Sequence, residues 1–250
     1  MIDSHMHINS KVLNNKGEYI NRINNNNFIE SVINVGLDIF TSKESIEISN
    51  RNSKFYSSVG IHPLYIGNQE LNELYNLSSN QKVVAIGEIG LDILNKDHYS
   101  QIKYLERQIF IANELKLPVI IHSNNTSREI IDIFKNCIKP KYGCVFHCFQ
   151  PDNDILDYLI GNNYYISFAS KITNKNAKKS IEILKKTPNN LFLVETDSPY
   201  LQFEFLDNLI NESSNIRYVI EKIAQVKNSN FKEIEKITSE NTKRLFKKMI

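Results

Sequence analysis

Residues 83–122 read VVAIGEIGLDILNKDHYSQIKYLERQIFIANELKLPVIIH, and this stretch indicates the fold. Its two ends, 83–87 and 119–122, are short apolar runs with the composition of buried strands. Between them, residues 100–115 have the period of an amphipathic helix, with apolar side chains on one face at Ile102, Leu105, Ile109 and Ala112. A strand, a helix and a second strand in this order predict a parallel βαβ unit.

Similar units follow one another along the whole chain. The predicted strands are 2–7, 32–36, 55–61, 83–87, 119–122, 144–147, 164–166 and 191–195. Eight strand–helix units in about 250 residues is the size of a (β/α)₈ TIM-type barrel, which is the α/β fold that we expect. A doubly wound open sheet is the alternative, because periodicity does not show whether a sheet closes.

The domain organisation is predicted to be simple. With 41% hydrophobic and 23% charged residues, the chain can bury a sizeable core, which excludes a disordered or fibrous protein. No internal repeat, linker or shift in composition divides it, so we expect residues 1–250 to form a single domain. Two helical segments, 215–226 and 231–249, are predicted at the end of the chain, with a break in the second near 238–241.

Charge and cysteine content restrict the function only weakly. The 30 Lys and Arg residues against 28 Asp and Glu leave a formal net charge of +2, so no global positive field favours nucleic acid. Cys137, Cys144 and Cys148 form no C-x-x-C pair, which argues against a disulfide framework and a thiolate zinc finger. The sequence has no recognisable signal peptide and no apolar stretch near about 18 residues, so we expect a soluble cytoplasmic protein that binds no membrane.

The positions of the histidines are more informative. Seven potential ligands lie at or just after the carboxyl ends of predicted strands: His5, His7, His62, Glu88, His122, His147 and Asp197. The carboxyl ends of barrel strands form one rim, and active sites are built on that rim. The sixth histidine, His98, precedes a helix instead, and we expect it to be exposed and without function.

The residue types at this rim favour divalent metal ions. His5 and His7 are two residues apart, so on an extended strand they point to the same face and can converge on one ion. Burying Glu88 after an apolar strand is costly unless a cation compensates its charge. Taken singly, each histidine could be a core residue and Glu88 half of a salt bridge. Together they form a mixed nitrogen and oxygen donor set, and the lack of thiolates argues against a closed structural zinc site.

An ordered series of motifs resembles the TatD family of metal-dependent deoxyribonucleases, within the amidohydrolase-type barrels. The motifs are DSHMH, VGIHP, GEIGLD, LPVIIHS, FHCF, VETDSPYL, NESSNIRYVIEKIA and TSENTKRLF, which cover nearly the whole chain. The resemblance implies that one ion is held by His5, His7, Glu88 and Asp197. It implies that Glu88 bridges to a second ion, which is also held by His122 and His147.

The resemblance also implies a reaction, the hydrolysis of phosphodiester bonds in DNA from its ends. Two divalent ions, Mg, Mn or Zn, would lower the pKa of a shared water and polarise the phosphoryl oxygen. Asp197 would orient that water and take its proton, while His62 and Lys175 would offset charge on the phosphate as substrate-binding residues. Asp92 would either hold a ligand by a hydrogen bond or cap a turn.

Three departures from the family pattern concern the substrate. Asn124 stands where the family usually has an arginine, and Ile93 where it usually has an aromatic residue. The basic loop that commonly follows the VETDSPYL motif is replaced by QFEFLDNLINES, residues 202–213, which contains no Lys or Arg. The alternatives are therefore a metallohydrolase of another ester or amide, such as a small phosphate ester, a lactone or an aminoacyl ester, and an inactive barrel that binds a partner. No protein partner is inferred.

Overall fold

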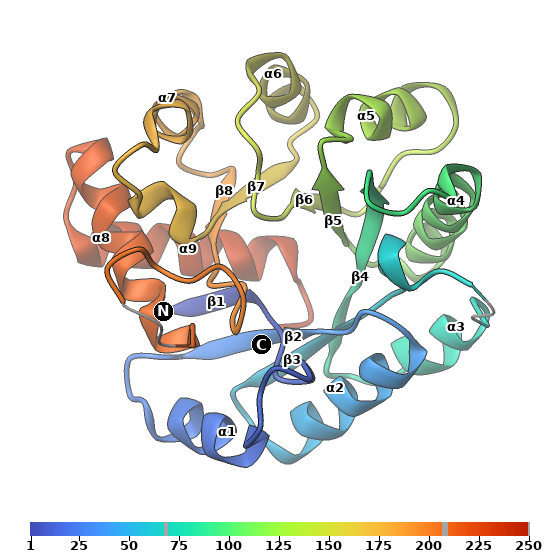
Figure 1. Ribbon diagram of the computed structural model, residues 1–250, viewed down its shortest axis with the longest axis horizontal. Helices are drawn as coiled ribbons and strands as arrows, with labels where there is room; N and C mark the ends of the chain where they lie inside the picture. The colour runs from blue at the N-terminus through green and yellow to red at the C-terminus, as the bar shows by residue number, and fades with distance from the viewer. Residues whose placement is uncertain (68–69, 207–209, 250) are drawn as a thin grey trace.

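The computed structural model describes residues 1–67, 70–206 and 210–249, and eight parallel strands alternate with helices along this chain (Figure 1). The strands are β1 (Ile2–Met6), β2 (Ser31–Val35), β3 (Phe55–Val59), β4 (Val83–Asp92), β5 (Val119–Asn124), β6 (Cys144–Phe146), β7 (Tyr165–Phe168) and β8 (Phe192–Val194). Each strand pairs in parallel with the next one, so that their order in the sheet is their order in the sequence. The eight predicted strands are all present.

The first and last strands meet and bring the sheet to a nearly closed barrel. An isolated parallel bridge joins Met6 to Ser198. The His7 amide donates to the Ser198 carbonyl at 2.7 Å, and the Asp197 amide donates to the His5 carbonyl at 2.9 Å. The alternative of an open doubly wound sheet is therefore wrong, and the TIM-type barrel is confirmed.

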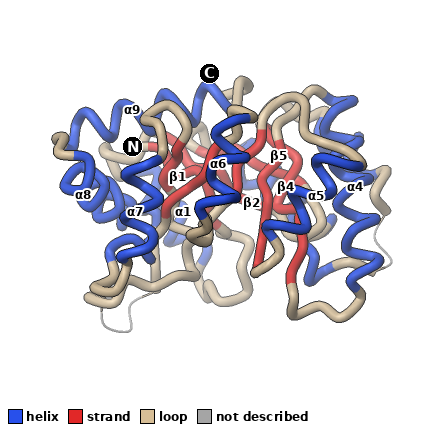
Figure 2. Tube along the Cα trace, turned by 90° about the horizontal axis from the view of Figure 1, so that it is seen from above, coloured by secondary structure: helices blue, strands red, loops and turns tan. Residues whose placement is uncertain are grey.

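Helices cover the outside of the barrel (Figures 1 and 2). They are α1 (Lys16–Asn25), α2 (Ile39–Arg51), α3 (Glu73–Ser78), α4 (His98–Leu115), α5 (Ser127–Asn136), α6 (Asn153–Gly161), α7 (Lys178–Lys186), α8 (Ile216–Lys227) and α9 (Phe231–Leu245), with short 3₁₀ turns η1 (Pro63–Tyr65), η2 (Ser170–Thr173) and η3 (Ser213–Asn215). None of the helices in the described ranges is long and apolar enough to cross a membrane.

Local capping explains where the central predicted helix begins and ends. Helix α4 starts two residues before the predicted Ser100, because the Asp97 carboxylate accepts a hydrogen bond from the Ser100 amide at 3.2 Å. It ends at Leu115, as predicted, and Lys116 follows in a left-handed conformation with φ of 55°.

The predicted break in the last helix is wrong. Helix α9 is continuous, because the Thr238 hydroxyl donates back to the Ile234 carbonyl at 2.9 Å and does not interrupt the helix. Asn241 points its amide away from the helix and donates to the carbonyls of Asn189 at 2.8 Å and Phe192 at 2.9 Å. The polar residues that suggested a break therefore attach α9 to the start of β8. The helix ends at Leu245, before the predicted residue 249.

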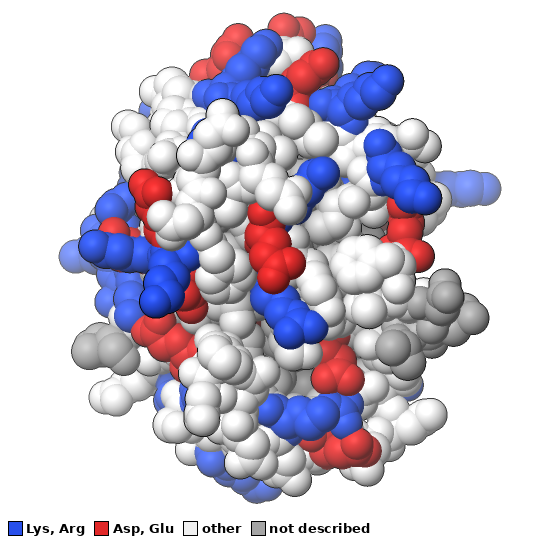
Figure 3. All heavy atoms as spheres, turned by 90° about the vertical axis from the view of Figure 1, so that its left-hand side faces the viewer, with Lys and Arg blue, Asp and Glu red and all other residues white. Residues whose placement is uncertain are grey.

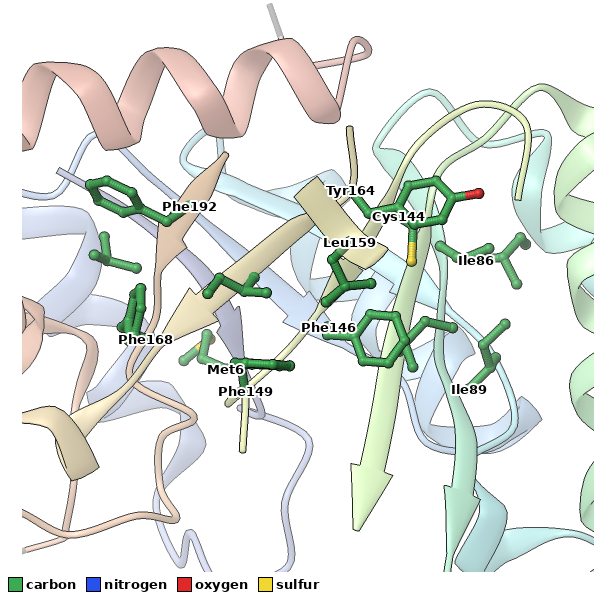
Figure 4. Close-up of a cluster of buried hydrophobic side chains, with 14 of the residues drawn as sticks. Met6, Ile86, Ile89, Cys144, Phe146, Phe149, Leu159, Tyr164, Phe168 and Phe192 are labelled. Atoms are coloured by element: carbon green, nitrogen blue, oxygen red, sulfur yellow. The ribbon is translucent and has the colours of Figure 1, made fainter. Parts of the chain in front are cut away.

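Two clusters of buried apolar side chains form the core of the molecule. The larger one joins strands to helices, and Figure 4 shows part of it, including Phe146 and Phe168. The smaller one contains Ile120 and Val145, together with Leu245 at the end of α9 and Phe246 directly after it. Ile120 and Val145 each precede a predicted metal ligand by two residues, so they share that ligand's face of the strand. The smaller cluster thus forms an apolar floor beneath the rim.

Candidate metal centre

The structure gathers seven of the predicted site residues into one histidine–carboxylate cluster at the carboxyl ends of the strands. Three of them lie within strands, namely His5 (β1), Glu88 (β4) and His122 (β5). The other four lie just after strands, namely His7 (β1), His62 (β3), His147 (β6) and Asp197 (β8). All seven side chains are buried or largely buried. The closed arrangement of the strands therefore places side chains 192 residues apart in sequence within reach of one another, from His5 to Asp197.

Glu88 lies at the centre of the cluster, and its two oxygens face different groups of histidines. Oε2 lies 3.3 Å from His5 Nε2 and 3.7 Å from His7 Nε2. Oε1 lies 2.7 Å from His122 Nδ1 and 2.8 Å from His147 Nε2. One carboxylate therefore faces two separate sets of potential ligands, as a bridging ligand must.

The first set is completed by Asp197. Its Oδ1 lies 3.3 Å from His7 Nε2 and 3.8 Å from His5 Nε2. The two Nε2 atoms are 3.1 Å apart. Nitrogen lone pairs and carboxylate oxygens that converge in this way form a donor set that suits a divalent cation. The ligand atoms of His5, His7 and Glu88 all lie within 4.8 Å of one another, so this group could hold a metal ion.

The second set contains His122 and His147, whose facing ring nitrogens are 3.4 Å apart. His62 lies on the same side of Glu88, with Nε2 3.5 Å from Oε1. His62, Glu88 and His122 also place their ligand atoms within 4.8 Å of one another. Distance alone therefore does not separate His62 from the ligands.

The hydrogen bonds of Nδ1, the ring nitrogen that points away from the cluster, do distinguish His62 from a ligand such as His7. His7 Nδ1 faces the Val35 carbonyl at 3.1 Å, and a carbonyl only accepts, so the proton is on Nδ1 and Nε2 offers its lone pair to the cluster. In His62 the opposite holds. Its Nδ1 accepts from the Leu64 amide at 3.1 Å, so in the neutral ring the proton is on Nε2, the atom that faces Glu88. His7 is thus oriented as a ligand, whereas His62 presents an N–H donor.

Asp92 orients His122, and it also caps a turn, so both interpretations made from the sequence hold. Its Oδ2 accepts from His122 Nε2 at 2.8 Å, which leaves the Nδ1 lone pair directed at Glu88. Its Oδ1 accepts from the Leu94 amide at 2.8 Å and from the Asn124 side chain at 3.1 Å. Asn124 therefore supports the carboxylate that pairs with His122.

Glu195 is a functional candidate that the sequence reasoning missed. It is buried, accepts from the Cys148 amide and the Ser167 hydroxyl at 2.6 Å each, and lies 3.4 Å from His147 Nδ1. A carboxylate on this side of His147 favours the proton on Nδ1 and leaves Nε2 free for an ion. The available signal was a second acidic residue in the apolar run LFLVETD, two residues before Asp197.

The electrostatics of the cluster follow from packing these groups together. Burial raises the pKa of Glu88, but the neighbouring histidines, His147 first, outweigh it and hold that pKa well below its ordinary value. Burial lowers the pKa of His147, but Glu88 and Glu195 outweigh this and raise it well above its ordinary value. Burial also lowers the pKa of His62, to about 3, so this ring is neutral near pH 7. A metal ion that binds here therefore replaces protons on histidines.

Lys175 is not part of this cluster. It is exposed in the turn before α7, and within the described ranges it makes no hydrogen bond or ion pair.

Of the acidic loop 202–213, residues 207–209 lie outside the described chain. Asn211 of that loop is buried and donates to the carbonyls of Thr196 and Tyr200 at 2.8 Å each. His98, which we expected to be exposed and without function, is half-exposed and pairs with Glu129.

A barrel whose rim gathers histidines and carboxylates around one glutamate has the donor set of a metal-dependent enzyme. The family model described as TatD related DNase matches residues 2–247, and the chain belongs to this family. It is 34% identical to an uncharacterized metal-dependent hydrolase, YabD of Bacillus subtilis, over 99% of each chain. It is 28% identical to an uncharacterized metal-dependent hydrolase, MJ1582 of Methanocaldococcus jannaschii, over 100% of this chain and 98% of that protein.

A solved structure of a TatD homologue has the same fold. The crystal structure of YjjV, a TatD homologue from Escherichia coli, superimposes with a TM-score of 0.90 at 24% identity and covers 99% of this chain and 98% of that one. The protein is a metal-dependent hydrolase of the TatD family, as the resemblance in the sequence implied.

Proposed function

We propose that this hydrolase cleaves phosphodiester bonds in DNA, starting from the ends of the strand. The observation that carries the proposal is Glu88, whose two oxygens face two sets of ligand atoms and suit it to bridge two divalent ions, Mg, Mn or Zn. Paired ions under about 4 Å apart are typical of enzymes that displace groups at phosphorus. The family description, TatD related DNase, supports the same substrate.

The proposed ion positions divide the ligands between them. His5, His7 and Asp197 would hold the first ion, His122 and His147 the second, and Glu88 both. When bound, the ions would supply Lewis acidity at the phosphoryl oxygen and lower the pKa of a nearby water.

Asp197 is suited to orient the attacking water and to accept its proton. Its side chain is 13% exposed, against 3% for Glu88, so it is the cluster carboxylate that solvent reaches more easily. The hydrogen bond with His7 first, and then the charges of His5 and His7, outweigh burial and lower its pKa. It is therefore ionised near pH 7, as a base must be.

His62 is suited to bind the substrate phosphate. Its proton is on Nε2, so it can donate a hydrogen bond to a nonbridging oxygen without being a metal ligand. We also propose Lys175 as a phosphate contact, since its exposed ammonium group has no partner among the described residues. Its contribution would be to substrate affinity.

A second candidate is a metallohydrolase of another ester or amide, and the absence of basic residues from two of the segments that follow strands favours it. The segments that follow β3 and β8, residues 60–81 and 195–216, contain no Lys or Arg. On the side of the molecule shown in Figure 3, Lys and Arg are interspersed with Asp and Glu and do not form one basic patch. A structural neighbour with a TM-score of 0.63 and 14% identity is a beta-aspartyl dipeptidase, which shares the fold alone.

An assay of the metal-loaded protein separates the two candidates. We expect release of nucleotides from single-stranded DNA, dependent on added Mg²⁺, Mn²⁺ or Zn²⁺ and abolished by a chelator. The control is the same preparation with Glu88→Ala. Hydrolysis of small phosphate esters, lactones or aminoacyl esters in the absence of nucleotide release would contradict the nuclease proposal.

The free cysteines Cys137, Cys144 and Cys148 agree with our further proposal that the protein acts in the cytoplasm.

A further inference from the structure

Two exposed tyrosines lie on either side of the histidine–carboxylate cluster. The Tyr65 ring packs edge-on against His62 with centroids 6.0 Å apart, and the Tyr200 ring packs in the same manner against His7 at 5.6 Å. His62 faces Oε1 of Glu88, whereas His7 faces Oε2. The two rings therefore border the two halves of the site.

Both rings are attached to a fixed backbone. The Tyr65 amide donates to the His62 carbonyl at 2.8 Å, and Asn95 donates to the Pro63 carbonyl at 2.7 Å, which joins η1 to the loop after β4. The Tyr200 amide donates to the Asp197 carbonyl at 2.9 Å. Its hydroxyl is hydrogen-bonded to Ser10 Oγ, also at 2.9 Å. Rings held in this way lose little freedom when a ligand packs on them.

Tyr65 is one of several exposed apolar side chains in η1 and in the loop after β4, two segments that the Asn95–Pro63 hydrogen bond joins. Tyr65 is 44% exposed, Leu64 45%, Ile93 57% and Leu94 70%. Contiguous exposed apolar side chains beside a candidate metal centre suit a ligand-binding surface. The pKa of Tyr65 is raised by partial burial first, and then by Tyr200, Asp38 and Glu88, which agrees with a position of both phenols at one mouth.

We propose that Tyr65 and Tyr200 bind an unpaired nucleobase next to the phosphate at the metal centre. This inference rests on the proposed nuclease function. Stacking on an aromatic ring suits every base and requires one that is not already stacked in a duplex. It also compensates for the absence of Lys and Arg from residues 60–81 and 195–216, because affinity comes from the base and not from many phosphates.

Binding of two matched monoesters tests the proposal without relying on catalysis. The probes are dTMP and 2-deoxyribose 5-phosphate, which differ only in the base, titrated by calorimetry into the protein in Mg²⁺. We expect dTMP to bind about 5- to 150-fold more tightly, the range for one stacked base. Tyr65→Leu should bring this ratio close to 1, and Tyr65→Phe, which keeps the ring, should preserve it. Tyr200→Leu should lower the ratio as well.

The matched control is Tyr142→Leu. Tyr142 is 41% exposed, as Tyr65 is, but it precedes β6 and so lies at the other end of the barrel. This variant should keep the wild-type ratio, and thermal melting should show that all variants are folded. Equal binding of the two probes by the wild-type protein, no binding of either, or a ratio unchanged in Tyr65→Leu would overturn the proposal.

The outcomes also distinguish this inference from the nuclease proposal. Nucleotide release from DNA together with a binding ratio near 1 would overturn the base site and leave the nuclease function standing. A ratio that depends on Tyr65, in a protein that hydrolyses no DNA, would support the base site and overturn the nuclease function.

Discussion

The two proposed ion positions on either side of Glu88 are built from different parts of the chain. The first takes His5 and His7 from the start of the sequence and Asp197 from near its end, so it lies at the seam where the isolated bridge between Met6 and Ser198 joins β1 to the segment after β8. The second takes His122 and His147 from β5 and from just after β6, which are paired neighbours in the sheet. The first position thus depends on barrel closure, whereas the second depends on one pair of strands.

The hydrogen bonds that orient the ligands differ in the same way. His7 is oriented by a backbone carbonyl, that of Val35 in β2. His122 is oriented by a carboxylate, Asp92, and His147 lies beside a second one, Glu195. Both histidines of the second position thus have a carboxylate near the ring nitrogen that faces away from the other ligands, so we expect this position to be the more sensitive to protons. Glu88 would thus bridge two different ion positions. In the first, a main-chain carbonyl orients His7, and in the second, carboxylates lie beside the rings of His122 and His147.

The largest effect is expected from Glu88→Ala, which removes the only ligand shared by the two positions. Both ions should be lost and hydrolysis should fall to background, because neither remaining set has its bridging oxygen. Elemental analysis of the purified protein measures this, with Glu129→Ala as a control at an exposed glutamate. Two ions per chain in Glu88→Ala would show that Glu88 does not bridge.

His122→Ala should divide the two positions. We expect it to empty the second position and leave about one ion per chain at the first, because the first set keeps all its ligands. Metal stoichiometry and activity measured on one sample test this. Equal loss of both ions would mean that the positions are not independent.

Asp92→Ala should weaken the second position without removing a ligand. The loss of the partner of His122 Nε2 should reduce metal affinity there by about 10- to 100-fold. Competition with a metal-binding dye gives the two affinities. Asn124→Ala is the control, since it removes a hydrogen bond of Asp92 but leaves His122 paired. An unchanged second affinity in Asp92→Ala would contradict the orienting role.

The pH dependence should differ between the two positions. Burial lowers the pKa of His122 and His147, but carboxylates outweigh it and raise both, so these rings take up protons at a higher pH than a free histidine would. In the first set, burial lowers the pKa of His5, whereas the burial of His7 is outweighed by Asp197, which raises the pKa of that ring, so only one of the two rings takes up protons more readily. Protons compete with the ion, so metal loss on acidification should begin at the second position, and activity should rise from about pH 5.5 to about pH 8. Metal content after dialysis at stepped pH checks the order, and earlier loss from the first position would contradict it.

The smallest effect is expected from Lys175→Ala, which lies outside both positions. It should raise KM several-fold and leave kcat unchanged, because it removes one phosphate contact and no ligand. The salt dependence of KM should be shallow, and a slope steeper than about −4 in a double-logarithmic plot would mean an extended DNA-binding surface. Lys178→Ala, at the start of α7, is the control.

The sequence was sufficient for the barrel and for the ligand types because both depend on local patterns. Alternating apolar runs and amphipathic helices define strand–helix units, and histidines directly after strands must lie at one rim. The break expected near 238–241 was wrong for the opposite reason. Only the packed structure shows that Asn241 bonds to the carbonyls of Asn189 and Phe192, so that its polar side chain has a partner outside the helix.

What the sequence by itself determined is which residues can bind metal, since that is a property of side-chain chemistry and strand position. What only the tertiary structure decided is how each ring is oriented. The division of ligands between the two oxygens of Glu88, the supporting carboxylates Asp92 and Glu195, and the N–H that His62 presents all depend on contacts between strands. A sequence motif lists donor atoms, but a ring nitrogen becomes a ligand or a donor only through the group that its other nitrogen meets.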